Sequence, residues 1–193
     1  MDNRVAGVLL AAGEGSRLGI PKAVVELGGR RLADRGAQLL RDGGAAPVLV
    51  VTGAVRVTVP GAVTVHNPDW ATGMGSSLAA GLRALPADCA AAVIALVDQP
   101  LIGAGAVQRL ITAYRAGAEV VVATYDGKPR NPVLLARGHW AGVLDAAVGD
   151  AGARPYLRAH PDLVTQVECA DTGRPDDVDT PEDLARLGSL LGG

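Results

Sequence analysis

The stretch Leu10-Ala11-Ala12-Gly13-Glu14-Gly15-Ser16-Arg17-Leu18-Gly19-Ile20-Pro21-Lys22 follows an apolar run of strand length, residues 5–10. Its small residues let the backbone approach a phosphate chain, and successive amide N–H groups can cradle anions. Arg17 and Lys22 add two cations of the kind that bind a triphosphate. The spacing is neither that of a Walker loop nor that of a dinucleotide-binding fingerprint. The pattern therefore favours a phosphate-binding loop, with a glycine-rich turn carrying two solvated cations as the alternative.

Outward from this loop, strand-like and helix-like segments alternate. Apolar runs of strand length occupy residues 5–10, 47–51, 63–66, 91–97, 119–124, 132–135 and 163–168. Helical spacing occupies residues 31–42, 76–85, 104–116 and 181–190, the last with Thr180 as N-cap. Strand runs without alternation predict a mostly parallel sheet covered on both faces. Because no clear helix separates the strands after residue 119, the second half is expected to be mixed.

Composition narrows the class of protein. The 193 residues carry 18 Lys+Arg against 20 Asp+Glu, a net charge of −2, and 49% hydrophobic residues, with Phe absent. This length predicts a single domain, 1–193. Near-neutral charge argues against nucleic acid as a partner, and the absence of a long apolar stretch argues against a membrane. The two cysteines form neither a zinc motif nor a disulfide framework, which predicts a cytoplasmic protein acting on small molecules.

Two acidic motifs follow the glycine loop. Asp98-Gln99-Pro100 comes at the end of the 91–97 run, where a carboxylate is well placed to hold Mg²⁺. Asp176-Asp177-Val178-Asp179-Thr180-Pro181 precedes the last predicted helix, and Asp179 could supply a second ligand. The alternatives are a turn cap at Asp98 and, at the second motif, acids favoured by the helix dipole alone.

Taken together, these motifs resemble the nucleotidyltransferase family that contains molybdenum cofactor cytidylyltransferase. Asn67-Pro68, Gly73-Met74-Gly75-Ser76-Ser77-Leu78 and Gly149-Asp150-Ala151-Gly152-Ala153-Arg154 are also similar to motifs of that family. The resemblance runs from about residue 5 to residue 190. It implies a three-layer α/β sandwich with a mostly parallel mixed sheet, of the nucleotide-diphospho-sugar transferase type.

The resemblance also implies roles for individual residues. Arg17, Lys22 and Asp98 would be catalytic, with Asp98 and Asp179 holding Mg²⁺. The nucleotide would contact Leu10, Ala11, Ala12, Gly13, Gly15, Ser16, Ser76 and Ser77. Ala12, where guanylyl-transferring relatives have glycine, leans towards CTP as the nucleoside triphosphate.

The implied reaction suits these residue types. A phosphate oxygen on the acceptor, such as molybdopterin, attacks the α-phosphorus of the nucleotide, and pyrophosphate leaves. The attacking phosphate is already ionised, so catalysis is positioning and charge neutralisation rather than general base chemistry. The scarcity of histidine, present only as His66, His139 and His160, therefore does not count against an enzyme.

Other functions remain open on the sequence. Where the family commonly has Gly-His-Pro-Val this chain has Arg130-Asn131-Pro132-Val133, which leaves the acceptor open. Residues 69–77 also resemble proteins described as nicotine blue oxidoreductases, which implies an NAD(P)H-dependent reductase as the alternative, although the dinucleotide spacing is missing. A third possibility is a non-catalytic nucleotide-binding partner of a molybdoenzyme, which retention of Asp98 and the loop cations disfavours.

Overall fold

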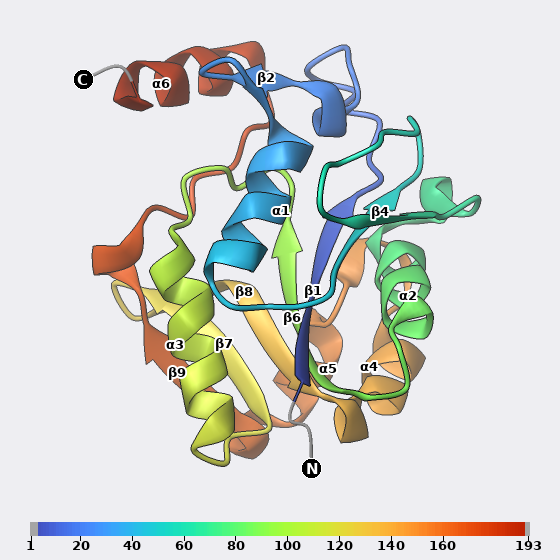
Figure 1. Ribbon diagram of the computed structural model, residues 1–193, viewed down its shortest axis with the longest axis vertical. Helices are drawn as coiled ribbons and strands as arrows, with labels where there is room; N and C mark the ends of the chain where they lie inside the picture. The colour runs from blue at the N-terminus through green and yellow to red at the C-terminus, as the bar shows by residue number, and fades with distance from the viewer. Residues whose placement is uncertain (1–3, 192–193) are drawn as a thin grey trace.

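Seven strands form one sheet in the computed structural model, which describes residues 4–191 (Figure 1). The sheet order is β5-β4-β1-β6-β8-β7-β9. The strands are β1 (Arg4–Ala11), β4 (Val48–Thr52), β5 (Val63–His66), β6 (Cys89–Leu96), β7 (Val120–Tyr125), β8 (Lys128–Ala136) and β9 (Val164–Glu168). β8 runs antiparallel to both of its neighbours, and the other pairs are parallel. The prediction of a mostly parallel sheet, mixed in its second half, is confirmed.

Helices cover both faces of the sheet, which makes three layers (Figure 1). One face packs against α1 (Leu32–Asp42) and α3 (Ala104–Arg115). The other packs against α2 (Met74–Ala84), α4 (Trp140–Ala146) and α5 (Arg154–Ala159). The last helix, α6 (Pro181–Leu191), contacts β2 (Glu26–Leu27), which pairs with β3 (Arg30–Arg31) beyond the end of the main sheet. Short 3₁₀ turns complete the fold: η1 (Lys22–Val24), η2 (Trp70–Thr72), η3 (Arg137–His139), η4 (Gly149–Ala151), η5 (Pro161–Leu163) and η6 (Ala170–Thr172).

The central strand β1 supplies both cores. Val8 and Leu9 are each fully buried, and they point to opposite faces because side chains alternate along a strand. A Cβ on Gly36 of α1 would lie 2.5 Å from Leu9, and one on Gly81 of α2 would lie 2.6 Å from Val8. Glycine at these two positions lets both helices sit close to β1. Burial of each such side chain stabilises the fold by about 1.5–3 kcal/mol.

Several elements differ from the sequence-based expectation. β8 begins at Lys128 rather than residue 132 because its first three residues pair with β7 beyond the Asp126-Gly127 turn. The short strands β2 and β3 and the helices α4 and α5 were not predicted, since segments of two to seven residues show no readable periodicity. The cap of α6 is confirmed: the Asp183 N–H donates to Thr180 Oγ1 over 3.2 Å, and Thr180 N–H donates back to the Asp183 carboxylate over 3.0 Å.

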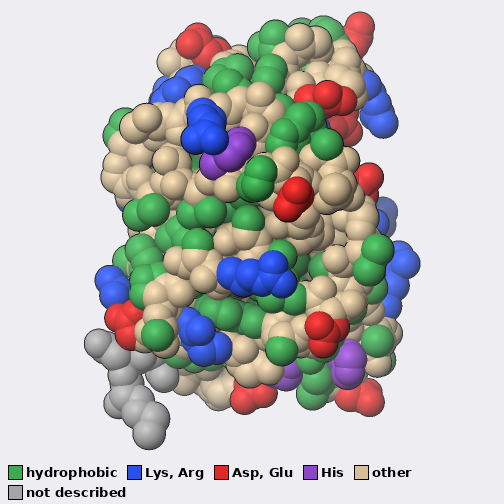
Figure 2. Space-filling view, turned by 90° about the vertical axis from the view of Figure 1, so that its right-hand side faces the viewer, with side chains coloured by type: hydrophobic (Ala, Val, Ile, Leu, Met, Phe, Trp, Pro, Cys, Tyr) green, Lys and Arg blue, Asp and Glu red, His purple; other side chains and the backbone are tan. Residues whose placement is uncertain are grey.

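On the face that Figure 2 shows, Lys and Arg side chains lie scattered between hydrophobic and uncharged ones, so this face of the described chain has no continuous basic surface. Within residues 4–191, none of the helices combines the length and apolar character needed to cross a membrane. One domain spanning 1–193 stays a prediction, and its outermost residues, 1–3 and 192–193, lie outside the described residues.

A carboxylate that was not singled out in the sequence joins β9 to the β7–β8 turn. Glu168 accepts hydrogen bonds from the N–H groups of Gly127, Ala170 and Asp126 and from the Thr124 hydroxyl. These donors, that of Gly127 first, lower the pKa of Glu168 from its usual 4.5 to about 2. A lowered pKa contributes stability above pH 4.5, and this contribution is lost as the pH falls towards 2.

We therefore expect the thermal midpoint of Glu168→Gln to lie below that of the wild type at pH 7. The difference between the two midpoints should shrink as the pH falls from 4.5 towards 2. Thermal unfolding of both proteins across pH 3–7 checks this. Glu182→Gln, which alters an exposed carboxyl group of α6, is the control. A deficit that stays constant or widens on acidification would contradict the role given to the carboxylate.

Candidate active site

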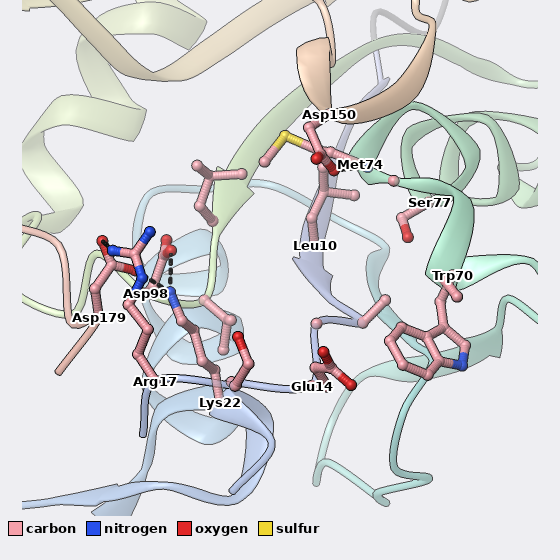
Figure 3. Close-up of a pocket in the computed structure, with 18 residues that line it drawn as sticks. Leu10, Glu14, Arg17, Lys22, Trp70, Met74, Ser77, Asp98, Asp150 and Asp179 are labelled. Atoms are coloured by element: carbon pink, nitrogen blue, oxygen red, sulfur yellow. Dashed lines mark hydrogen bonds and ion pairs between the residues drawn. The ribbon is translucent and has the colours of Figure 1, made fainter. Parts of the chain in front are cut away.

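A cleft of about 410 Å³ opens at the carboxyl ends of β1 and β6. Its walls are the glycine loop after β1, the end of β6, the segment from η2 into α2, the turn η4, and Asp179 ahead of α6. Figure 3 shows two groups of labelled side chains on opposite sides of this cleft, with Leu10 and Glu14 between them. One end holds Arg17, Lys22, Asp98 and Asp179; the other holds Trp70, Met74, Ser77 and Asp150.

The first group is a compact cluster of charges. Lys22 Nζ lies 2.8 Å from Asp98 Oδ2 and 2.5 Å from Asp179 Oδ1. Arg17 Nη1 lies 4.0 Å from the other oxygen of Asp179. The Lys22 side chain is only 16% exposed, whereas that of Arg17 is 74% exposed. Lys22 is therefore fixed between the two carboxylates, and Arg17 is free to close on a ligand from the solvent side.

Backbone hydrogen bonds bring the two acidic loops together. The Val178 N–H donates to the carbonyl of Asp98 over 2.8 Å, and Val178 itself is fully buried. The Asp179 N–H donates to the Asp183 carboxylate over 3.1 Å, which ties it to the first turn of α6. Both carboxylates therefore have defined positions although they are far apart in the chain.

The electrostatics keep Lys22 charged. Burial acts to lower the pKa of Lys22, but the negative charge of Asp98 and hydrogen bonds to Asp179 and Asp98 outweigh it and raise the pKa. Next to this cluster, burial raises the pKa of Asp177, against a hydrogen bond from Gln99, and the nearby charges of Asp98 and Asp179 raise it further. The carboxyl groups around Lys22 thus outnumber the single ammonium group that contacts them, so this cluster can accommodate a further positive charge.

The donor set fits a divalent cation. Asp98 Oδ1 is buried and has no hydrogen-bond partner among the described residues, although a buried carboxylate oxygen normally requires one. Within residues 4–191, no group of three or more His, Cys, Asp or Glu side chains is placed to hold a metal by itself. A cation that takes one or two carboxylates and completes its shell with substrate phosphates suits such a site. Asp98 and Asp179 are the residues that would hold it.

The glycine loop makes a tight turn over this cluster. Gly15 has a φ of +63°, and a Cβ there would collide with the carbonyl of Ile20. The N–H groups of Leu18 and Gly19 both donate to the Gly15 carbonyl over 2.9 Å. A residue with a side chain at position 15 would open this turn and shift Arg17.

At the other end of the cleft, Asn67 is buried and donates its amide to Ser76 Oγ over 2.8 Å and to Ser77 Oγ over 3.0 Å. Ser77 lines the cleft. Ser76 instead donates towards the backbone carbonyls of Asp69 and Gly73. Asp150 accepts from the Met74 N–H over 3.3 Å.

The structure gathers most of the predicted site residues in this one cleft: Leu10, Ala12, Gly13, Gly15, Ser16, Arg17, Lys22, Ser77, Asp98 and Asp179. Ala11 lies in the hydrophobic core instead, and Ser76 lies behind the wall of the cleft. Eight other residues that line it were not named as site residues from the sequence: Glu14, Trp70, Ala71, Gly73, Met74, Leu96, Val97 and Asp150. Glu14, Gly73, Met74 and Asp150 stand within the motifs quoted above, which is the signal that could have found them.

Gln99, the neighbour of Asp98 in the chain, connects the two acidic loops by a hydrogen bond to Asp177. It is buried, and its amide Nε2 donates to Asp177 Oδ1 over 2.9 Å, while its Oε1 has no partner among the described residues. We expect Asp177→Ala to destabilise the fold by about 1 kcal/mol, because it leaves a buried N–H donor unpaired. Gln99→Leu should cost less, since it removes the unpaired oxygen together with the donor. Urea unfolding of both variants checks the order, and a larger loss for Gln99→Leu would contradict it.

The cleft beyond the strand ends brings the glycine loop, two cations and two carboxylates to one place, an arrangement that suits the phosphates of a nucleotide. The chain belongs to the MobA-like NTP transferase domain family, whose profile matches residues 7–164. This confirms both the expected fold class and the resemblance to that family.

Individual relatives extend the comparison. "Nicotine blue oxidoreductase" of Paenarthrobacter nicotinovorans is 40% identical over 204 residues, which cover 95% of this chain and 96% of the relative. "Probable molybdenum cofactor guanylyltransferase" of Opitutus terrae is 37% identical over 125 residues, covering 64% of this chain and 62% of the relative.

Two solved structures share the fold over nearly the whole chain. The homologue of Mycobacterium tuberculosis Rv0371c from Mycobacterium sp. strain JC1 superposes with a TM-score of 0.83 at 30% identity, covering 100% of this chain and 98% of its own. Rv0371c of Mycobacterium tuberculosis, in complex with manganese, superposes with a TM-score of 0.80 at 23% identity, covering 96% of this chain and 98% of its own.

Proposed function

We propose that this enzyme transfers a cytidylyl-type group from a nucleoside triphosphate, with CTP favoured, to a phosphate-bearing acceptor such as molybdopterin, with Mg²⁺ as its metal. The observation that carries the proposal is the position of Lys22, between Asp98 and Asp179 and on the same cleft wall as Arg17. Cations and metal-type carboxylates at one point suit a polyphosphate better than any other common ligand.

The chain's own residues account for the chemistry. Lys22 and Arg17 bind the β- and γ-phosphates and offset the charge that develops on the leaving pyrophosphate. An acceptor phosphate oxygen forms a bond to the α-phosphorus as the bond from that phosphorus to the bridging oxygen breaks. Held by Asp98 and Asp179, Mg²⁺ would supply additional positive charge at the phosphates. Since the nucleophile is already an anion, none of the residues has to remove a proton.

Several observations support the finer parts of the proposal. The small side chain of Ala12 on the cleft wall is the feature that leans towards CTP. A relative described as a molybdenum cofactor guanylyltransferase supports a molybdopterin acceptor, with a molybdoenzyme as the recipient of the product. A fold neighbour solved with manganese supports a divalent metal. Two buried cysteines that form no disulfide support a cytoplasmic location.

The test is to incubate the chain with each nucleoside triphosphate, Mg²⁺ and molybdopterin, and to measure pyrophosphate release. Release with CTP that depends on both the acceptor and the metal is expected. Chelation of divalent ions should abolish it. Pyrophosphate at the background rate with all four nucleotides would overturn the proposal.

The alternative raised from the sequence, an NAD(P)H-dependent reductase on the same scaffold, is not favoured, although a protein described as nicotine blue oxidoreductase is 40% identical to this chain. The glycine loop argues against it, because the loop lacks the G-x-G-x-x-G spacing of a dinucleotide-binding fingerprint. Loss of NADH absorbance with a quinonoid dye, in the absence of nucleoside triphosphate, separates the two functions.

A further inference from the structure

Asp150 stands at the end of the cleft opposite to the charge cluster. It lies in η4, which packs directly on the first turn of α2: a Cβ on Gly73 would collide with Gly149, and one on Gly75 would come within 2.5 Å of the Ala147 carbonyl. Figure 3 shows Asp150 beside Met74 and above Leu10, with Lys22 and Asp98 across the cleft. The close packing fixes the backbone of Asp150 at the cleft wall.

The carboxylate of Asp150 excludes phosphate from its end of the cleft. Its Oδ1 accepts from the Met74 N–H, the first N–H of α2, so it already occupies the anion-binding start of that helix. Arg17 and Lys22 lie at the other end. The charges at the two ends therefore favour one orientation of a nucleoside triphosphate, with its phosphates towards Lys22 and its nucleoside towards Asp150.

The nucleoside end also has a defined hydrogen-bonding character. Asp150 has a second oxygen available, and an ionised carboxylate only accepts hydrogen bonds. Ser77 Oγ already accepts from Asn67, so its own hydroxyl is a donor. A ligand here must present at least one donor, which a ribose hydroxyl or a base amino group supplies.

We propose that Asp150 is a nucleoside-recognition residue, which accepts a hydrogen bond from a donor on the nucleoside and orients the triphosphate towards Lys22. This inference rests on the proposed function, because it requires a nucleoside triphosphate in the cleft. It assigns to Asp150 substrate selection rather than chemistry.

Asp150→Asn is the informative variant. The Asn side-chain oxygen can still accept from the Met74 N–H and so keep α2 capped, but the second oxygen becomes an NH₂ group, which cannot accept. The matched control is Asp145→Asn, which removes the same charge from an exposed position on the neighbouring helix α4. Thermal unfolding of both variants verifies that the fold is kept.

Calorimetric titration in the presence of Mg²⁺ measures the affinity of each protein for two ligands. One is the nucleoside triphosphate that the wild-type chain binds most tightly, and the other is inorganic tripolyphosphate, which has no nucleoside. We expect Asp150→Asn to weaken nucleotide binding about tenfold or more, the usual effect of losing a hydrogen bond to a charged group. Tripolyphosphate binding should be unchanged, and Asp145→Asn should alter neither.

The 2′-deoxy and 3′-deoxy nucleotides identify the donor. Suppose that the wild-type chain binds one deoxy nucleotide more weakly than the ribonucleotide, whereas Asp150→Asn binds the two equally. The donor is then the ribose hydroxyl that this deoxy nucleotide lacks. If the wild-type chain binds both deoxy forms as tightly as the ribonucleotide, the donor is on the base.

Equal nucleotide affinity in the wild type and in Asp150→Asn, or an equal loss for nucleotide and tripolyphosphate, overturns the inference and leaves the proposed function standing. A wild-type chain that binds neither ligand overturns both.

Discussion

Asp98→Asn is expected to slow pyrophosphate release by roughly a hundredfold or more, the scale on which removing one preorganised electrostatic group acts, while the fold stays intact. The Asp98 side chain is 22% exposed, and its Oδ1 is buried without a partner in the described part of the chain. Removing this charge therefore takes away the proposed metal ligand but no structural hydrogen bond at that oxygen. Its backbone carbonyl still accepts from Val178.

Steady-state pyrophosphate release and thermal unfolding, measured on the same preparations, check both parts of the expectation. Asp162→Asn, at an exposed position in η5, is the matched control and should behave as the wild type. An Asp98→Asn protein that turns over normally would remove this carboxylate from the chemistry. One that unfolds would make it a structural residue.

Lys22→Met is expected to have two effects, both due to the loss of one ammonium group. Two carboxylates that each contact the same nitrogen would be left facing each other. We expect the fold to lose about 1–2 kcal/mol, less than for a fully buried pair because Asp179 is 42% exposed. Nucleotide affinity should fall roughly tenfold to a hundredfold, since hydrogen bonds to a charged group are lost.

A divalent cation distinguishes this account from simple loss of packing. Mg²⁺ or Mn²⁺ should raise the thermal midpoint of Lys22→Met more than that of the wild type, because the cation replaces the missing charge between the carboxylates. Lys128→Met, the same substitution at an exposed position on β8, should respond as the wild type does. A Lys22→Met protein whose stability is insensitive to divalent cations would contradict the pairing.

The sequence predicted the central strands of the sheet well because they are buried on both faces. Continuous apolar runs such as residues 91–97 predict strands wherever helices cover both sides, and the glycine loop was readable from residue type alone. The side chains on the loop were less predictable. Leu10 and Ala12 line the cleft, while Ala11 between them faces the core, the alternation expected of the strand that runs into the loop.

Helix phase explains the difference between the two serines. α2 begins at Met74, two residues before the predicted helix, and neighbouring residues of a helix point about 100° apart. Ser77 therefore faces the cleft while Ser76 bonds backward to the η2 segment. Asp150 was missed for another reason. Its position depends on the packing of η4 against α2, a contact between segments 76 residues apart that periodicity does not report.

The central claim is that Arg17, Lys22 and a cation held by Asp98 and Asp179 share one polyphosphate. The most direct measurement is a crystal structure of the chain with Mn²⁺ and a non-reactive nucleoside triphosphate, using the anomalous signal of manganese to place the metal. The account predicts manganese bound to Asp98, triphosphate oxygens on Lys22 and Arg17, and the nucleoside beside Asp150. A triphosphate bound at the start of α2, or a metal away from Asp98, would contradict it.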